Sequence, residues 1–201
     1  MRVVMAGICV LVACGSSPAF AQDVHGGFKG GANFAKLDFG ASDAPNVDIR
    51  TGVVFGGFVE WPVGPALTIQ PEMLVANKGA SFAQDGVKFT ARLWFVEVPV
   101  LASVGVARSG STSIRVFGGP SFGFRTSAKL RAEANGLSDE QDVKDQVKAF
   151  DFGLAFGAGI AAGRFVADGR YTFGLTDLNK GTTLDSSVHN RVFTVLAGVR
   201  F

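Results

Sequence analysis

Residues 190–201 read NRVFTVLAGVRF and end on a phenylalanine. Apolar side chains occupy every second position of this stretch, with polar or small residues at most of the positions between them, which predicts a β-strand. Val192 and Leu196 are the two apolar exceptions on the polar face. A strand facing water would leave the ring of Phe201 uncovered, whereas a strand facing lipid would not. The pattern therefore favours a strand of a transmembrane β-barrel, in which lipid-facing apolar residues alternate with lumen-facing polar residues.

The same alternation recurs along the whole chain and predicts further strands upstream. The connections between these strands alternate between long and short, which is typical of an outer-membrane barrel with long extracellular loops, short periplasmic turns and both termini in the periplasm. The sequence therefore predicts an all-β fold, an eight-stranded antiparallel up-and-down transmembrane β-barrel. The predicted strands cover residues 24–37, 51–61, 67–78, 89–101, 113–124, 151–160, 165–173 and 190–201.

Residues 1–21 are predicted to be a secretory signal peptide. Arg2 precedes an apolar run over residues 3–13, and residues 19–21, Ala-Phe-Ala, supply a cleavage site. The mature barrel domain would then cover residues 22–201 and lie in the bacterial outer membrane.

Both cysteines of the chain, Cys9 and Cys14, lie within this segment. A protein cleaved after Ala21 has no thiol, which excludes disulfides, thiol catalysis and cysteine metal sites. Residues 11–14, LVAC, also match a lipoprotein box, so lipidation of Cys14 is an alternative to cleavage after Ala21.

Composition excludes two further classes of protein. After the first segment no stretch approaches the roughly 18 continuous apolar residues of a membrane helix. Removing Arg2 from the 19 basic residues leaves 18, against 17 acidic ones, so no charge excess predicts a nucleic-acid partner.

The longest insertion, residues 125–149, carries a helical signal. Ser138 with Gln141 three positions later is typical of a capping box, and Val143 and Val147 follow at helical spacing. We expect a short amphipathic helix over the mouth of the barrel. Disorder is the alternative, because charged residues are crowded into the same segment.

Several short motifs resemble one family when they are taken in order. They are KGGANF at 29–34, GFVEWP at 57–62, QPEML at 70–74, VEVPV at 96–100, GGPSFG at 118–123, DGRY at 168–171 and GVRF at 198–201. This set resembles the small outer-membrane β-barrel family often labelled porin-family or PorT-like. The resemblance implies an eight-stranded barrel of the OmpX and OmpA membrane-domain type, and it brings no catalytic, cofactor or metal residues. Barrel-assembly signals usually have glycine at the sixth position from the end, where this chain has Leu196.

Charged residues of both signs fall on the face assigned to the lumen. Eight strands leave an interior only wide enough for side chains to fill, so we expect a packed polar plug instead of a substrate channel. Glu72 and Glu97 are expected to face Arg115 and Arg170, with Asp168 in the same network, although spacing leaves the pairs open. The lumen-facing charges are Lys29, Glu60, Glu72, Glu97, Arg115, Asp151, Asp168, Arg170 and Arg200.

Two arginines, Arg92 and Arg191, fall instead on the outward face near the expected extracellular rim. We expect them to contact lipopolysaccharide phosphates, with a snorkelling side chain as the simpler alternative. Aromatic residues near strand ends on the same face are typical of the girdles of a membrane barrel. They are Trp61, Trp94, Tyr171 and Phe201.

The sequence therefore predicts a monomeric outer-membrane barrel without enzymatic activity or cofactor, with a structural or interaction role through its extracellular loops. Its expected partners are outer-membrane lipid, lipopolysaccharide and the barrel assembly machinery. A soluble periplasmic lipocalin-like binding barrel is one alternative, and it would need apolar residues inside. An outer-membrane lipid-modifying hydrolase is another, because His189 follows Asp185, Ser186 and Ser187 closely. The expected loops are residues 39–49, 80–88, 125–149 and 176–187.

Overall fold

The computed structural model describes residues 24–39, 50–84, 87–134, 137–144, 148–176 and 188–201. The expected signal peptide, residues 1–21, lies outside this part of the chain. No helix among the described residues is long and apolar enough to cross a membrane. The strands are β1 (His25–Phe39), β2 (Arg50–Pro62), β3 (Leu67–Gln84), β4 (Val87–Ser109), β5 (Thr112–Ala134), β6 (Leu137–Asp142), β7 (Phe150–Ala162), β8 (Phe165–Gly174) and β9 (Val188–Arg200).

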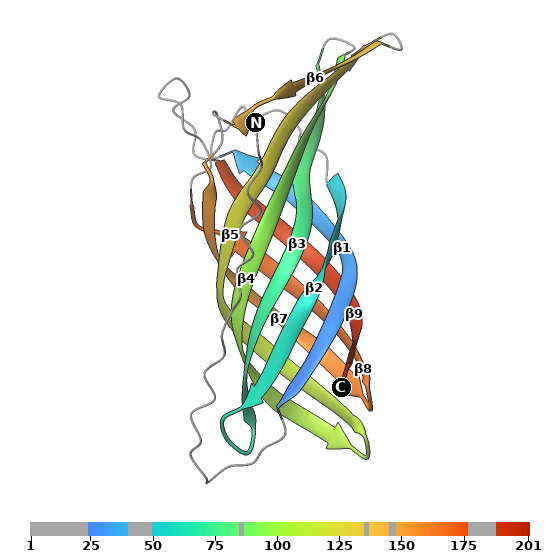
Figure 1. Cartoon of the computed structure of the whole chain (residues 1–201), viewed down its shortest axis with the longest axis vertical. Coiled ribbons are helices and arrows are strands. Elements are labelled where there is room, and N and C mark those ends of the chain that lie inside the picture. The colour runs from blue at the N-terminus through green and yellow to red at the C-terminus, as the bar shows by residue number, and fades with distance from the viewer. Residues whose placement is uncertain (1–23, 40–49, 85–86, 135–136, 145–147, 177–187) are drawn as a thin grey trace, which may run out of the picture.

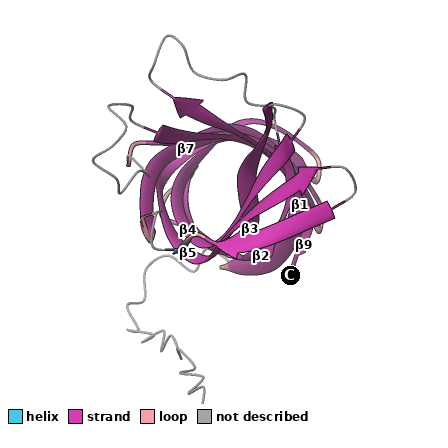
Figure 2. Cartoon of the chain, turned by 90° about the horizontal axis from the view of Figure 1, so that it is seen from above, coloured by secondary structure: helices cyan, strands magenta, loops and turns pink. Residues whose placement is uncertain are grey.

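Eight of the nine described strands close into one antiparallel barrel (Figures 1 and 2). Neighbours in the ring follow the chain order, except that β7 pairs directly with β5. The ring closes where β9 pairs with β1, from Arg200 opposite Gly27 to Val188 opposite Phe39. Among the described strands β6 pairs with β5 alone, outside the ring. The predicted eight-stranded antiparallel barrel is confirmed.

The alternation of faces is also confirmed in the closing strand, β9. Val192 and Leu196 are each 1% exposed and point into the barrel, whereas Phe193 and Val195 are 44% and 46% exposed on its outer surface. The two apolar exceptions on the polar face are therefore part of the interior. Leu196 packs there in a buried cluster with Val54, Leu74 and Ala76.

Both described ends of the chain lie at one end of the barrel, which we call the terminal end (bottom of Figure 1). The amide of Gly26 donates to the carbonyl of Phe201 at 3.2 Å, and the amide of Phe201 donates to the carbonyl of Gly26 at 2.9 Å. Short connections lie at the same end. One of them, residues 163–164, joins β7 to β8. Gly163 has a φ of 57°, which a residue with a Cβ rarely adopts.

At the opposite, distal end, four strands continue beyond the ring as a sheet of their own (top of Figure 1). The ladder of β2 with β3 ends at Val54 and Ala76, and that of β5 with β7 ends at Phe124 and Phe150. Beyond these points β3, β4, β5 and β6 pair only with one another among the described residues. We call this distal sheet residues 77–84, 87–94, 127–134 and 137–142.

The distal sheet corrects the expected loop over residues 80–88. Apart from residues 85–86, which lie outside the described part, this segment belongs to β3 and β4. The two strands keep their register up to Gln84 opposite Val87. Continuous backbone pairing across the hairpin explains why these residues extend as strands even though many of them are small or polar.

The expected helix in residues 125–149 is also wrong. Residues 127–134 continue β5, and β6 folds back on them from Ala134 opposite Leu137 to Lys129 opposite Asp142. Ser138 and Gln141 of the expected capping box both lie in β6. The edge of β5 offers β6 a ladder of backbone hydrogen bonds, and that tertiary pairing outweighs a weak local signal for a helix. Val147 lies outside the described residues.

Two bulges change which face the residues at the ends of β4 and β5 occupy. Trp94 lies opposite Ser127 and Phe95 opposite Arg125, so Thr126 is an extra residue in β5. At the terminal end Val106 is an extra residue in β4. An extra residue moves all later side chains of that strand to the other face.

Candidate functional site

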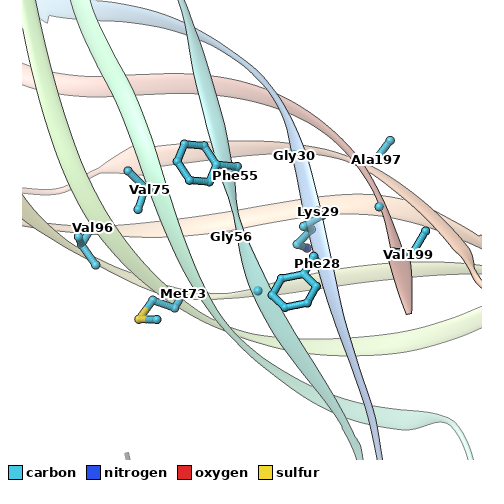
Figure 3. Close-up of a pocket in the computed structure, with 12 residues that line it drawn as sticks. Phe28, Lys29, Gly30, Phe55, Gly56, Met73, Val75, Val96, Ala197 and Val199 are labelled. Carbon is cyan, nitrogen blue, oxygen red and sulfur yellow. The ribbon is translucent and has the colours of Figure 1, made fainter. Parts of the chain in front are cut away.

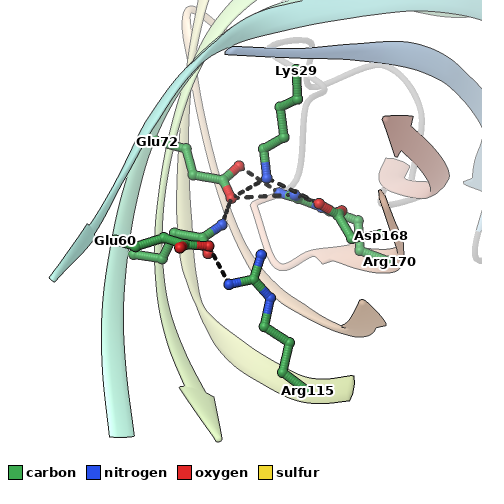
Figure 4. Close-up of polar contacts among 7 residues, drawn as sticks. Lys29, Glu60, Glu72, Arg115, Asp168 and Arg170 are labelled. Carbon is green, nitrogen blue, oxygen red and sulfur yellow. Dashed lines mark hydrogen bonds and ion pairs between the residues drawn. The ribbon is translucent and has the colours of Figure 1, made fainter. Parts of the chain in front are cut away.

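Four charged side chains meet inside the barrel (Figure 4). Lys29 Nζ of β1 lies 2.6 Å from Glu72 Oε1 of β3 and 3.0 Å from Asp168 Oδ2 of β8. Arg170 of β8 donates from Nη1 to Glu72 Oε2 at 2.7 Å and from Nη2 to Asp168 Oδ1 at 2.8 Å. Gln70 Nε2 completes the set by donating to Glu72 Oε1 at 2.6 Å. We call Lys29, Glu72, Asp168 and Arg170 the central cluster.

The central cluster is balanced in charge and closed to solvent. Two cations face two carboxylates, and each of the four side chains is 5% exposed or less. Buried ions are tolerated when they are paired and hydrogen-bonded, and removing one partner of such a pair costs about 3–5 kcal/mol. The cluster therefore links β1, β3 and β8 across the lumen through buried ion pairs.

Two further ion-pair clusters lie in the lumen on either side of the central one. Towards the terminal end, Glu60 accepts a hydrogen bond from Arg115 through Oε1 and another from Arg200 Nη1 through Oε2, the latter at 3.1 Å. Towards the distal end, Lys78 pairs with Glu97.

Three of the lumen cations also lie over buried phenylalanine rings. Such contacts between a cation and the face of an aromatic ring contribute roughly 0.5–2 kcal/mol each. They also allow charged and apolar side chains to share one packed interior. Measured from the cation to the ring centroid, the contacts are Lys29 over Phe58 at 5.0 Å, Arg170 over Phe117 at 5.5 Å and Lys78 over Phe95 at 5.6 Å.

A lumen-facing glycine makes room for one of these rings. A Cβ added to Gly157 would lie 2.9 Å from Phe117 and 2.2 Å from the backbone oxygen of Gly169. The absence of a side chain at Gly157 therefore lets Phe117 pack beneath Arg170.

The structure places the five expected network residues at three levels of the lumen. Glu72, Asp168 and Arg170 belong to the central cluster. Glu97 lies with Lys78 towards the distal end, and Arg115 lies with Glu60 near the terminal end. The structure thus brings Glu72 and Arg170 together but does not bring Glu97 and Arg115 together. The expected network did not include Lys29 and Lys78, although the period-two pattern of the sequence places both on the face directed into the lumen.

The outer surface is apolar over the height of the ring. The side chains that alternate with the lumen residues are exposed on every strand of the ring. No loop or strand covers them in the described part of the chain. The exposed apolar residues include Phe28, Val53, Phe55, Trp61, Met73, Val116, Phe124, Leu154, Phe156, Ile160, Phe165, Phe193, Val195 and Phe201.

A shallow apolar groove of about 680 Å³ crosses this surface (Figure 3). Phe28 lies opposite Gly57 on the neighbouring strand, and Phe55 lies opposite Gly30. The two rings therefore flank positions that have no side chain, and Met73 forms another wall. Such a shape suits contact with hydrocarbon.

The two outward arginines lie on opposite sides of the barrel. Arg92 is on β4 opposite Lys129, and Arg191 is on β9 with its guanidinium 5.4 Å from the ring centroid of Phe173. Three strands separate β4 from β9 in either direction around the ring. The two side chains therefore belong to separate surfaces.

An ion pair and a hydrogen bond join the side chains of β5 and β6 in the distal sheet. Lys129 Nζ lies 2.6 Å from Glu140 Oε1, and Arg131 Nη2 donates to Ser138 Oγ at 3.1 Å. The hydrogen bond from Lys129 holds the pKa of Glu140 below its ordinary value, and the same contact raises the pKa of Lys129. At the base of the distal sheet Leu93, Phe95 and Ala128 form a buried apolar cluster.

The described part of the chain contains no group of three or more His, Cys, Asp or Glu side chains able to hold a metal ion. The residues behind the hydrolase alternative lie outside it, since residues 177–187 and the side chain of His189 are not described.

A closed barrel with an apolar exterior and an ion-paired interior defines the class of transmembrane β-barrel proteins. The chain belongs to the outer membrane protein β-barrel domain family, whose model matches residues 20–180. It is therefore a bacterial outer-membrane protein, as the sequence predicted, and the soluble lipocalin-like alternative is wrong.

Solved structures with a similar fold include three outer-membrane proteins. Ail, the attachment invasion locus protein of Yersinia pestis, was solved in complex with the heparin analogue sucrose octasulfate. It is 15% identical, with 90% of this chain and 100% of that chain covered and a TM-score of 0.47. Neisserial surface protein A is 10% identical, with coverage of 89% and 97% and a TM-score of 0.47. OprG from Pseudomonas aeruginosa is 12% identical, with coverage of 89% and 94% and a TM-score of 0.47. The search of curated proteins gave no match.

Proposed function

We propose that this outer-membrane barrel is a structural or interaction protein without catalytic activity, and that it acts through its distal end. The distal sheet is the observation that carries the proposal. β4 and β5 have 23 residues each, whereas about 9–11 residues suffice for a strand to cross the membrane. The surplus projects from the ring as a stable surface on which a partner can dock.

The lengths of the connections support an orientation with the distal end outside the cell. Short turns of a bacterial outer-membrane barrel face the periplasm and long loops face outwards. The short turns at residues 63–66, 110–111 and 163–164 lie at the terminal end. The distal sheet would then be extracellular, and both described ends of the chain periplasmic.

The plugged lumen favours this function over that of a diffusion porin. The four buried charges of the central cluster link β1, β3 and β8 across the lumen, and a ring of eight strands leaves an interior only wide enough for side chains. We expect purified protein in a planar lipid bilayer to give no steady conductance above that of the bilayer.

We further propose that the barrel is a monomer and that Arg92 and Arg191 bind phosphates of lipopolysaccharide. Arg92 is exposed at the base of the distal sheet, and Arg191 lies against the aromatic ring of Phe173 at the edge of the apolar surface. A guanidinium at that height can form bidentate hydrogen bonds with a phosphate group.

The test is the amount of lipopolysaccharide that co-purifies with the full barrel. We expect the double variant Arg92→Gln/Arg191→Gln to retain less than half of the wild-type amount. Arg164→Gln, which removes an exposed guanidinium at the terminal end, should retain the wild-type amount. If the double variant and the wild type retained equal amounts of lipopolysaccharide, the proposed contact would be contradicted.

A further inference from the structure

A polar pocket of about 520 Å³ lies at the terminal end of the barrel. Its walls are the turn between β2 and β3, the foot of the β4–β5 hairpin and the adjoining ends of β1 and β9. Glu60, Arg115 and Arg200 line it together with Arg108 of β4. The pocket is therefore an open extension of the terminal-end ion-pair cluster.

This cluster differs from the other two in its charge balance. The central cluster sets two cations against two carboxylates, and Lys78 is matched by Glu97. In the terminal-end cluster Glu60 alone faces two guanidinium groups, whose side chains are only 12% and 23% exposed. One positive charge is thus left uncompensated in a poorly solvated place, a condition that favours an added anion.

The bulge at Val106 adds another positive charge to the same pocket. Before the bulge, Gly105 lies opposite the lumen-facing Arg115, and after it Arg108 lies opposite the lumen-facing Ser113. Without the extra residue, Arg108 would have the parity of the lipid-facing positions. In the described part of the chain Arg108 has no ion pair or hydrogen bond, and it is exposed to solvent.

The arginines have hydrogen-bond donors to spare. A guanidinium carries five N–H donors, of which Arg115 gives one to Glu60 and Arg200 gives one to Glu60 and one to the carbonyl of Gly163. Hydroxyl groups of Ser103 and Ser113 line the same pocket. Among its described lining residues Glu60 is the only carboxylate.

We infer that this pocket is a binding site for an oxyanion, a carboxylate or phosphate group, presented from the periplasm. Arg108 and the unused donors of Arg115 and Arg200 hold the anion, and Glu60 sets its affinity by competing for the same guanidinium groups. Forked donors suit both planar carboxylates and phosphates. The periplasmic access of this site rests on the orientation proposed above, whereas its binding of an anion does not depend on any role of the distal sheet.

The test uses the full barrel purified in a zwitterionic detergent at low salt. Two probes are titrated separately, inorganic phosphate and the dicarboxylate peptide acetyl-Asp-Glu-amide, and binding is followed by backbone amide shifts in the β4–β5 hairpin. We expect saturable binding of at least one probe, weakened roughly three- to tenfold by Arg108→Gln, because one charge-assisted contact is lost. The preferred probe shows whether phosphate or carboxylate is the natural group.

A second variant separates a binding site from a merely structural cluster. Glu60→Gln should bind the preferred probe roughly three- to tenfold more tightly, because the competing carboxylate is gone. If Glu60 served only to hold the arginines in place, Glu60→Gln would bind the probe more weakly than the wild type or equally well. Arg131→Gln in the distal sheet, outside the pocket, should bind as the wild type does.

The heat-dependent mobility of each variant on a detergent gel establishes that its barrel is closed. The inference is overturned if neither probe gives saturable shifts in the hairpin. It is also overturned if Arg108→Gln and Arg131→Gln bind the probe equally well. Arg108 is exposed and unpaired in the described structure, so its variant tests the site even if Glu60→Gln fails to fold.

Discussion

At the scale of single residues, Glu72 is where the hydrogen bonds of the central cluster converge. Lys29, Arg170 and Gln70 all donate to its carboxylate. We expect Glu72→Gln to lower the free energy of unfolding by about 3–5 kcal/mol, because two buried cations would then share only Asp168. Urea unfolding in lipid vesicles, followed by tryptophan fluorescence, measures the change.

The control for this variant restores the balance of charge. Lys29→Met/Glu72→Gln leaves Arg170 paired with Asp168 at 2.8 Å, so it should lose less stability than Glu72→Gln alone. If the double variant instead loses the sum of the two single losses, the two side chains act independently and the plug is not a coupled unit.

Arg50 is the residue that joins the ring to the distal sheet. Its guanidinium donates to the carbonyl of Lys78 at 2.7 Å, to the carbonyl of Ala91 at 3.2 Å and to Asn77 Oδ1 at 2.9 Å, just past the end of the β2–β3 ladder. We expect Arg50→Gln to cost the distal sheet about 1–3 kcal/mol of local stability. Amide hydrogen exchange should quicken in residues 77–80 and 90–93 but not in β8. Uniform quickening in all strands would contradict a local role.

The sequence predicts the face of a residue well but its level in the lumen poorly. Alternation with period two assigned Glu97 and Arg115 to the interior, where both lie. Their contacts depend on the stagger of strands that are not neighbours, which is a property of the closed barrel and not of any one strand. Arg108 illustrates the same limit, because its face depends on the bulge at Val106.

At the scale of elements, the distal sheet could have been recognised from two dipeptides in the sequence. Residues 85–86 are Asp-Gly and residues 135–136 are Asn-Gly, the dipeptides that most favour two-residue β-hairpins. Both lie between residues that face each other in register, Gln84 with Val87 and Ala134 with Leu137. The capping-box pattern of Ser138 and Gln141 favoured a helix in the same segment, which is why that prediction was wrong.

The tip of the β5–β6 hairpin should be dispensable for folding. The amide of Val143 donates to the carbonyl of Ala128 at 3.1 Å, so replacing residues 129–142 with Asn-Gly would close the sheet at a pair already in contact. We expect this variant to reach the outer membrane and to keep its heat-dependent mobility on gels, because none of the described residues in the deleted segment belongs to the three lumen clusters. Loss of the closed form would show that the distal sheet is part of the barrel's folding unit.

The contact between Lys129 and Glu140 gives the same hairpin a pH dependence. The pKa of Glu140 is lowered, so the stabilisation is present above the ordinary carboxylate pKa of about 4.3 and is lost as the pH falls through the lower folded value. Because the pKa of Lys129 is raised, the ion pair persists to a higher pH than one made by an ordinary lysine. Carboxyl shifts in an NMR titration should show Glu140 titrating at lower pH than in Lys129→Gln. Equal midpoints in the two proteins would contradict the pairing.

At the scale of the whole molecule, β6 is an edge strand of the distal sheet among the strands that the structure describes. Unpaired edges invite association with other strands, and charged side chains are one way in which proteins discourage it. β6 carries Asp139, Glu140 and Asp142 within six residues. This acidic edge supports the proposal that the barrel is a monomer.

The orientation of the barrel gives the most decisive prediction at this scale. Both cysteines lie in residues 1–21, so a chain cleaved after Ala21 has no thiol, and single cysteines can be introduced without interference. Ser138→Cys places a thiol in β6, and Ser111→Cys places one in the turn between β4 and β5. On intact cells a membrane-impermeant maleimide should label the first protein and not the second, whereas both should react after the outer membrane is opened. The unsubstituted chain, carried through the same treatment, controls for background. The reverse pattern would put the distal sheet in the periplasm, so that the extended surface could serve only a periplasmic partner and the oxyanion pocket would open to the outside of the cell.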